Sequence, residues 1–362
     1  MVASDTLLKA LQTCLDPNTR KDFVSARAVK NLEISPDGDV SFDVELGYPA
    51  KSQIPALRRA LIAAAKAVPG VQNVSVNLQS VITAHAVQRG VALLPNVKNV
   101  IAVASGKGGV GKSTTAVNLA LALAAEGARV GLLDADIYGP SQALMMGIEG
   151  RPQSEDGDTM EPLENYGVQV MSIGFLVDAD EAMIWRGPMA VQALEQLLRK
   201  TNWKNLDYLV IDMPPGTGDI HLTLSQKVPV TGAVVVTTPQ DIALLDARKG
   251  VKMFEKVGVP ILGVVENMAV HVCSQCGHVE HIFGSGGGQK MAADYGLAYL
   301  GALPLDIDIR LQADSGRPSV VFDPDGEVAG LYKSLARQVA VAVADMDKDY
   351  SAKFSAIAIK RA

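Results

Sequence analysis

The chain has 362 residues, of which 48% are apolar and 5% aromatic, and its 33 Lys and Arg against 39 Asp and Glu give a formal net charge of −6. This apolar content excludes disorder as the main state, and the acidic balance argues against a general nucleic-acid binder. Three cysteines are too few for a disulfide framework, and no uncharged apolar run approaches the ~20 residues of a membrane-spanning helix. We therefore expect a cytoplasmic α/β protein with no nucleic-acid partner and no stable membrane association.

Residues 1–90 have the pattern of a small α+β domain. Leucines at helical spacing precede Asp16-Pro17, which ends the first predicted helix, and Cys14 near that end is expected to be a small core residue. Pro36-Asp37-Gly38-Asp39 has the signature of a hairpin turn. The expected elements in chain order are a helix over 5–15, strands over 29–34 and 40–46, a helix over 54–68 and a strand over 71–78.

Residues 91–98 contain Pro95 and are predicted to be a linker, and residues 99–362 form a second domain. Short apolar strands alternate there with longer helices, which predicts a mostly parallel sheet covered by helices on both faces. The tail over 351–362 is expected to be packed or frayed rather than a membrane-surface helix. The strands are predicted over 100–104, 130–133, 168–173, 208–211, 232–237, 261–265 and 298–303, and the helices over 113–125, 188–198, 243–257, 289–295 and 328–346.

The strongest motif in the chain is the glycine-rich segment over 106–113, GKGGVGKS. It matches G-x-x-x-x-G-K-[ST] between a predicted strand and a predicted helix, which is the context of a phosphate-binding loop, or P-loop. Its backbone N–H groups would face phosphate oxygens, Lys112 would reach the terminal phosphates and the Ser113 hydroxyl would ligate Mg²⁺. The segment therefore predicts a site for a nucleoside triphosphate.

A second lysine, Lys107, follows the first glycine of this loop. The pattern K-G-G-x-G-K-[ST] resembles the deviant Walker A motif of a P-loop ATPase class that includes nitrogenase iron protein, division-site regulators and partition ATPases. In that class the early lysine crosses a dimer interface to the partner's nucleotide, so the resemblance implies ATP-dependent dimerisation. An incidental surface lysine is the alternative interpretation.

Acidic residues follow two of the predicted strands. Asp134 and Asp136 lie in LLDADIYGPS, and Asp212 ends the strand in YLVIDMPPGTGD. By resemblance to the same class, Asp136 would position the attacking water, Asp134 would lie near Mg²⁺, and Asp212 would orient Mg²⁺ through water. The loop over 214–218 is similar to a switch loop that senses the γ-phosphate. Solvated loop acids are the other interpretation.

Asn267 ends the segment GVVENM and matches the base-recognition position of the class, with Pro239-Gln240 as a wall of the adenine pocket. A polar cap at the end of a strand is a rival interpretation of Asn267. The residues predicted to bind the nucleotide are Gly106, Lys107, Gly108, Gly109, Val110, Gly111, Lys112, Ser113, Thr114 and Asn267, and those predicted to take part in hydrolysis are Lys107, Lys112, Asp136 and Asp212.

The other two cysteines, Cys273 and Cys276, form a C-x-x-C pair followed by a glycine in HVCSQCGHVEH. Such a turn directs both sulfurs at one metal centre. The pair could be half of a four-cysteine [4Fe–4S] site completed by a second chain. It could instead bind zinc with His278 or His281, although these spacings are shorter than those of Cys₂His₂ fingers. A thioredoxin-like redox pair is the third interpretation, but such pairs open a helix early in a βαβ unit.

In this order, the deviant P-loop, DADIYGPS, DMPPGTGD, VENM and CxxCG followed by HIFGSGGG resemble the Mrp-type iron–sulfur cluster carrier family. The resemblance covers about residues 95–345, and residues 1–90 are similar to the small domain of iron–sulfur assembly factors. It implies a homodimer that hydrolyses ATP with Mg²⁺ and holds a [4Fe–4S] cluster at the paired Cys273 and Cys276. The cluster would come from an assembly scaffold and pass to apo iron–sulfur proteins. The alternative function is an ATP-switched spatial regulator or tether with a structural zinc knuckle.

Overall fold

The computed structural model describes residues 2–88, 91–177, 187–216 and 218–348, with only the backbone at residues 219–222. Thr217 of the predicted switch loop and the tail over 349–362 lie outside the described residues. The chain divides into two compact units, residues 1–82 with 125–128 and residues 83–124 with 129–362. They are called the N-terminal unit and the P-loop unit below.

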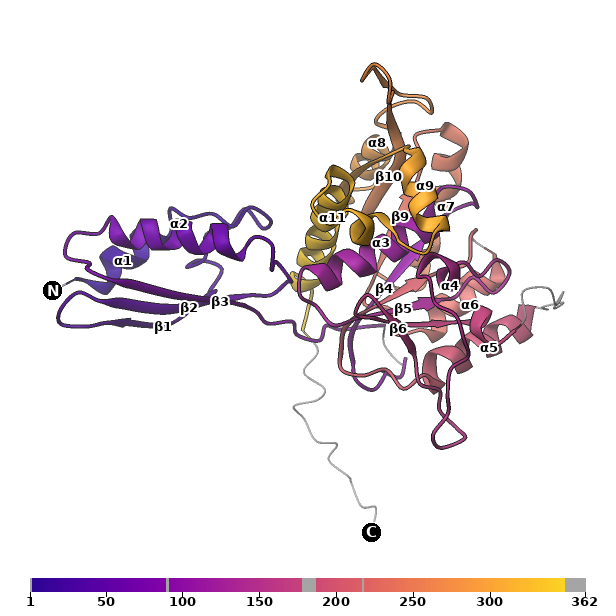
Figure 1. Cartoon of the computed structure of the whole chain (residues 1–362), viewed down its shortest axis with the longest axis horizontal. Coiled ribbons are helices and arrows are strands. Elements are labelled where there is room, and N and C mark those ends of the chain that lie inside the picture. Colours follow the sequence, from indigo (N-terminus) through magenta and orange to yellow (C-terminus); the bar gives the residue numbers. More distant parts are fainter. Residues whose placement is uncertain (1, 89–90, 178–186, 217, 349–362) are drawn as a thin grey trace, which may run out of the picture. The chain divides into compact units, whose positions relative to one another are not determined.

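The N-terminal unit is a three-stranded sheet with helices on one side (Figure 1). Alternate residues of the central strand, from Val40 to Leu46, are buried with Leu7, Leu11 and Leu61 of the helices, as a half-buried strand requires. The predicted turn is present, since Ser35 N donates to Asp39 O at 2.8 Å. Its elements are α1 (Ser4–Leu11), β1 (Val29–Ile34), β2 (Val40–Leu46), α2 (Ile54–Lys66) and β3 (Val74–Ser80), with β1–β2 antiparallel and β2–β3 parallel.

The P-loop unit has a mostly parallel sheet in the order β11-β10-β9-β4-β8-β5-β7-β6, with β12 beside β10. Only the β6–β7 and β10–β11 pairings among the described strands are antiparallel. The strands are β4 (Val97–Ala104), β5 (Val130–Asp134), β6 (Leu163–Asn165), β7 (Val168–Ser172), β8 (Leu206–Asp212), β9 (Gly232–Thr237), β10 (Ile261–Val272), β11 (Val279–Glu280) and β12 (Tyr299–Pro304).

Helices cover both faces of this sheet, with α3 and α11 on one side and α5, α6 and α7 on the other (Figure 1). Right-handed crossovers produce this division, because the chain moves from β4 to β5 in one direction and from β8 to β9 in the other. The predicted fold class is confirmed. The helices are α3 (Lys112–Ala125), α4 (Gln142–Met145), α5 (Gly187–Lys200), α6 (Asp219–Lys227), α7 (Asp241–Lys256), α8 (Gly287–Asp294), α9 (Ile307–Asp314), α10 (Ser319–Phe322) and α11 (Glu327–Ala344), with a 3₁₀ turn at Ile173–Phe175.

Several element boundaries differ from the predicted ones. The first helix ends at Leu11 rather than residue 15, and β4 begins at Val97, inside the segment predicted to be a linker. The largest difference is β10, which runs to Val272 instead of ending at residue 265. Of the helices within the described residues, none is long and apolar enough to cross a membrane.

Candidate functional site

The carboxyl ends of β4, β5 and β8 meet at one edge of the sheet, and the P-loop begins there. Asp134 and Asp212 are register partners on adjacent parallel strands, so their side chains lie beside each other. The loop follows β4 and leads into α3, whose first residue is Lys112. This arrangement is typical of nucleotide-binding α/β proteins, in which ligands bind outside the carboxyl ends of the strands.

Two glycines of the loop are required by close packing. A Cβ on Gly106 would lie 2.1 Å from the backbone carbon of Asp246 in α7. A Cβ on Gly111 would lie 2.1 Å from Asn267 Nδ2, and its φ of +79° is in the left-handed region that favours glycine. These positions bring the loop backbone against α7 and β10. The other predicted loop residues are Gly108 and Gly109, which are exposed, Val110, which is buried, and Thr114 in the first turn of α3.

Lys112 is buried and lies among the predicted acids. Its Nζ is 2.5 Å from Asp212 Oδ1, 3.7 Å from Asp136 Oδ2 and 3.2 Å from the Ser113 hydroxyl oxygen. The structure therefore brings together four predicted residues, Lys112, Ser113, Asp136 and Asp212, which we call the P-loop cluster. Its hydroxyl and carboxylate oxygens are the hard donors that Mg²⁺ prefers, so the residues fit that ion.

Burial raises the pKa of Asp136, although the Lys112 ammonium opposes this change. Burial, followed by repulsion from Asp212, raises the pKa of the neighbouring Asp134 to about 7. Asp134 keeps acceptor contacts all the same, because the Ser172 hydroxyl and the backbone N–H groups of Ser141 and Gln142 all donate to its Oδ2. Acids with raised pKa values at the mouth of a P-loop are typical of functional sites.

Gln142 also joins this cluster, and its role was not predicted from the sequence. Its Nε2 donates to Asp212 Oδ2 at 2.8 Å and to the carbonyl oxygen of Ser113 at 3.1 Å. The sequence carries only a weak signal for it, the position of a polar residue directly after the DADIYGPS segment. These contacts depend on segments that are distant in the sequence, and short-range patterns do not report them.

Asn267 contacts the P-loop from the opposite side. Its Nδ2 donates to the carbonyl oxygen of Val110 at 2.8 Å, and its side chain is buried. The next residue, Met268, has φ of +55°, and the pairing of β10 with β12 shifts register between Glu266 and Val270. This bulge directs Asn267 toward the loop. Its predicted contact with adenine stays a prediction.

Lys107 is half-exposed on the loop, and its backbone carbonyl accepts a hydrogen bond from the Ser105 hydroxyl at 2.8 Å. Within the described part of the chain, the ion pairs of the cluster are made by Lys112 and not by Lys107. An exposed position suits a lysine that acts outside its own subunit, but the role of Lys107 stays a prediction.

The C-x-x-C pair lies at the tip of a β-hairpin, which we call the cysteine arm (residues 269–282). Its strands are the end of β10 and the two-residue β11, with Val272 opposite Val279. Cys273 N donates to His278 O at 2.9 Å and Gly277 N donates to Cys273 O at 2.8 Å, which closes the turn. Gly277 has φ of +70°, as a tight turn requires.

The thiols of the arm are free, with Cys273 half-buried and Cys276 exposed. Hydrogen bonds from the backbone N–H groups of Gln275 and then Cys276 lower the pKa of the Cys273 thiol. A lowered pKa favours the thiolate, which is the form that binds metal. The turn therefore prepares a sulfur ligand.

Two histidines of the arm contact backbone carbonyl groups, and the third, His278, has its Nε2 at 3.9 Å from Glu280 Oε1. His281 Nδ1 donates to the carbonyl oxygen of Ala269 at 2.9 Å, and His271 Nδ1 donates to that of Leu305 at 3.0 Å. Across residues 2–88, 91–177, 187–216 and 218–348, no group of three or more His, Cys, Asp or Glu side chains is arranged to hold a metal ion. The arm therefore offers two free thiols from this chain, and their role as ligands stays a prediction.

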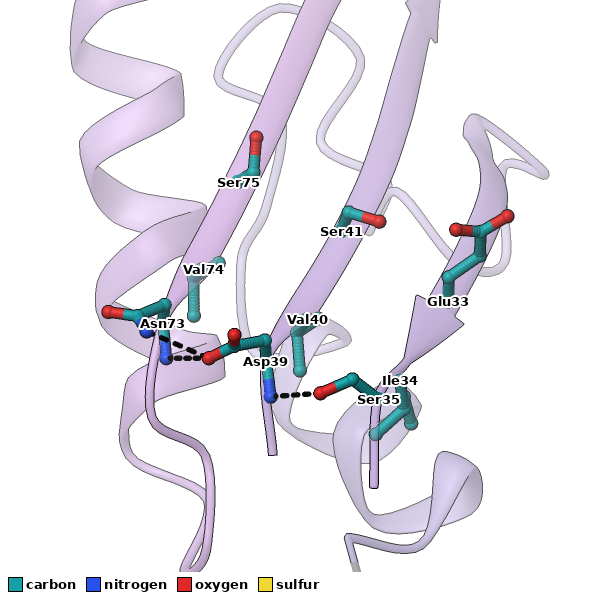
Figure 2. A pocket seen from close by; sticks show the side chains of 9 residues that line it. All are labelled: Glu33, Ile34, Ser35, Asp39, Val40, Ser41, Asn73, Val74 and Ser75. Carbon is teal, nitrogen blue, oxygen red and sulfur yellow. Dashed lines mark hydrogen bonds between the residues drawn. The ribbon is translucent and has the colours of Figure 1, made fainter. Parts of the chain in front are cut away.

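A hollow of about 430 Å³ lies in the N-terminal unit, on the sheet between the ends of β1, β2 and β3 (Figure 2). Three of its polar residues are hydrogen-bonded to one another: Asn73 Nδ2 donates to Asp39 Oδ1 at 2.8 Å, and Asp39 N donates to the Ser35 hydroxyl at 3.0 Å. These bonds stabilise the turn and the start of the neighbouring strand. We assign no ligand to this hollow.

Known families match both parts of the sequence. Residues 96–340 match the family described as NUBPL iron-transfer P-loop NTPase. Residues 4–77 match a family described as iron-sulfur cluster assembly protein. The first match covers more than half of the chain and contains both the P-loop cluster and the cysteine arm.

Curated relatives are described as iron-sulfur cluster carrier proteins. The chain is 62% identical over 269 residues to an iron-sulfur cluster carrier protein of Pseudomonas fragi, covering 74% of this chain and 94% of the relative. It is 63% identical over 245 residues to the iron-sulfur cluster carrier protein of Escherichia coli strain K12, covering 67% of this chain and 66% of that relative. Among solved structures, a nucleotide-binding protein of Archaeoglobus fulgidus in complex with ADP is similar with a TM-score of 0.57 and 36% identity, over 66% of this chain and 93% of that one.

Proposed function

The chain belongs to the NUBPL iron-transfer P-loop NTPase family, and from this premise we propose that it is an ATP-hydrolysing carrier of [4Fe–4S] clusters. The Mrp-type resemblance seen in the sequence is thereby confirmed. The carrier would act as a homodimer, receive the cluster from an assembly scaffold and transfer it to apo iron–sulfur proteins. Free thiols are required for this cargo, which favours the reducing cytoplasm.

One observation carries the proposal: β10 links both sites directly. At Asn267 this strand contacts the P-loop, and five residues after Met268 it presents Cys273 at the tip of the arm. A change in the loop at Val110 can therefore act on the strand that holds the sulfur ligands. Coupling of this kind needs two states in which the arm contacts the cluster differently.

The P-loop cluster supplies the groups that ATP hydrolysis needs. We propose that Lys112 contacts the terminal phosphates, that Asp136 positions the attacking water, and that Lys107 reaches the nucleotide of the partner subunit. Ser113 would hold Mg²⁺ directly and Asp212 through water, and the ion would neutralise charge on the phosphates. The products are ADP and phosphate, and their release would switch the dimer between holding and releasing the cluster.

The cysteine arm supplies two thiolates, and a [4Fe–4S] cluster is usually bound by four. A second copy of the chain, related by a two-fold axis, would supply the other two. The exposed apolar side chains beside the turn, Val272, Val279 and Ile282, support burial of this surface against another protein. The homodimer is therefore part of the proposal.

Cluster transfer tests the proposed function. Anaerobic protein is incubated with ferric iron, sulfide and an excess of a thiol reductant, desalted, and mixed with an apo-enzyme whose activity requires a [4Fe–4S] cluster. We expect the reconstituted carrier to have a broad absorption band in the visible range. The enzyme should recover its activity even when an iron chelator removes free iron. A carrier that takes up no cluster, or that activates the enzyme no faster than free iron and sulfide do, would contradict the proposal.

A further inference from the structure

Gln142 is a fully buried glutamine whose contacts bring three separate segments together. It is the first residue of α4, and its backbone N donates to Asp134 Oδ2 at 3.0 Å. Its side-chain Nε2 donates to Asp212 Oδ2 at the end of β8 and to the Ser113 carbonyl at the start of α3. One residue thereby fixes the segment after β5 against the P-loop and against the acid of β8.

The other end of the same amide has no such contact. Gln142 Oε1 is buried and finds no hydrogen-bond partner among the described residues. Burying an amide oxygen without a hydrogen-bond partner destabilises the folded protein, because the oxygen loses its bonds to water. Native proteins therefore rarely keep such an oxygen without a bound water or ligand. The Ser141 hydroxyl, one residue earlier, also lacks a partner in the described part of the chain.

The contacts of Nε2, on the same amide, indicate which donor Oε1 accepts from. The amide lies beside Asp212 and Ser113, and their carboxylate and hydroxyl oxygens are suited to Mg²⁺. The nearby ammonium of Lys112 is already directed at Asp212. Water bound to a divalent cation is a strong donor, and outer-shell acceptors of this kind orient the ligands of a metal site.

We propose that Gln142 is a positioning residue for Mg²⁺ at the nucleotide site. Its Nε2 fixes the orientation of Asp212, and its Oε1 accepts a hydrogen bond from a metal-bound water. This inference rests on the proposed function, because it requires that Mg²⁺ and a nucleotide bind at the P-loop cluster. It goes further in assigning a role to a residue outside the P-loop and the strand-end acids.

A role of Gln142 in positioning the metal and a role in packing alone predict different dependences of nucleotide binding on Mg²⁺. If Gln142 only filled space, its replacement would weaken nucleotide binding equally with and without Mg²⁺. If it positions the metal, the replacement changes the dependence on Mg²⁺ itself. The informative quantity is therefore the ratio of nucleotide affinities measured with Mg²⁺ and with EDTA.

The experiment uses full-length protein and ADP labelled with a fluorescent group on the ribose, titrated in EDTA and at increasing Mg²⁺. Gln142→Met keeps the length of the side chain and removes both polar ends. We expect the half-saturating Mg²⁺ concentration to rise at least about 10-fold, and the affinity ratio to fall by a similar factor. Gln196→Met on the exposed face of α5 is the matched control and should leave both unchanged.

A second variant, Gln142→Asn, keeps the amide but places it farther from Asp212, because the side chain is one methylene shorter. A change in the Mg²⁺ dependence of this variant supports the inference even if Gln142→Met does not fold. Circular dichroism establishes folding. Wild-type-like Mg²⁺ dependence in a folded variant would overturn the inference while leaving the proposed function intact. Wild-type protein that binds ADP without any effect of Mg²⁺ would instead contradict the proposed nucleotide site itself.

Discussion

The P-loop cluster and the cysteine arm belong to the same unit but are built in opposite ways. In the cluster, Lys112, Asp136 and Asp212 are buried, and each meets a partner from another segment of this chain. In the arm, Cys276 is exposed and the turn is closed by its own backbone. The P-loop cluster is assembled within one chain, whereas the arm presents free thiols.

The two regions differ in what fixes the positions of their functional side chains. Parallel strands fix the acids of the cluster, because Asp134 and Asp212 are register partners in a buried sheet. The arm has only two strands beyond the sheet, and such ribbons are marginal in isolation. Its geometry would be completed by whatever it binds, which is consistent with a site that must hold and release a cargo.

The largest expected effect is the loss of cluster binding when the cysteines of the arm are replaced. Replacing Cys273 and Cys276 by Ser removes both sulfur ligands, so we expect cluster content after anaerobic reconstitution to fall to background. Iron and acid-labile sulfide assays measure it. Cys14→Ser is the control, because the Cys14 thiol donates to the Ala60 carbonyl in the N-terminal unit, and it should retain full cluster content. Equal cluster content in the double variant and the wild type would refute the assignment of the arm.

The reciprocal change is at Lys112. Lys112→Ala removes the ammonium that faces Asp136 and Asp212, and we expect ATP turnover to fall at least about 100-fold, as for other groups that stabilise a transition state. Phosphate release measures turnover, and Lys30→Ala on the exposed part of β1 is the control. Cluster content should stay largely intact. If it is lost together with turnover, the two regions are not separable in the way described above.

A smaller effect is expected where β10 joins the regions. Asn267→Ala leaves the buried carbonyl of Val110 without its donor, which should cost about 1–2 kcal/mol of unfolding free energy. Urea unfolding measures this cost. Asn202→Ala, which removes a surface hydrogen bond to Glu161, should change stability much less. A loss of nucleotide affinity with no loss of stability would favour the adenine contact as the sole role of Asn267.

The smallest expected effect is a difference in thiol titration. Backbone hydrogen bonds lower the pKa of Cys273, whereas burial raises the pKa of Cys14. The Cys273 thiolate therefore forms at lower pH, and in metal-free protein its alkylation should reach half its maximum rate at lower pH than that of Cys14. Peptide mapping by mass spectrometry after timed iodoacetamide treatment measures both. The two profiles should converge in denaturant, and identical profiles in the folded protein would contradict the assigned environments.

The sequence was sufficient for the parts of the molecule that depend on local patterns. The P-loop motif lies between an apolar strand and a helix, and uninterrupted apolar strands predicted the parallel sheet. The acids at 134, 136 and 212 were found because they follow predicted strands behind the P-loop motif and match the acids of the deviant P-loop class, which they resemble. For these features, spacing along the chain is enough to determine the position in space.

The features that the sequence did not predict depend on long-range partners. The predicted strand ends at residue 265, before the polar residues Glu266 and Asn267, yet β10 continues to Val272. Glu266 is accommodated because its carboxylate accepts hydrogen bonds from the backbone N–H groups of Gly286 and Gly288, about twenty residues later. Gln142 belongs to a four-residue helix, too short to show a periodic pattern.

Native mass spectrometry of the reconstituted protein tests the central claim most directly, because it counts chains and metal in one particle. A P-loop cluster in each chain and a cluster site shared by two chains predict a dimer that carries one [4Fe–4S] cluster, with ADP bound at up to one per chain. The double cysteine variant should show no cluster. A monomer that carries the whole cluster, or one zinc ion per chain in place of iron and sulfide, would contradict the account.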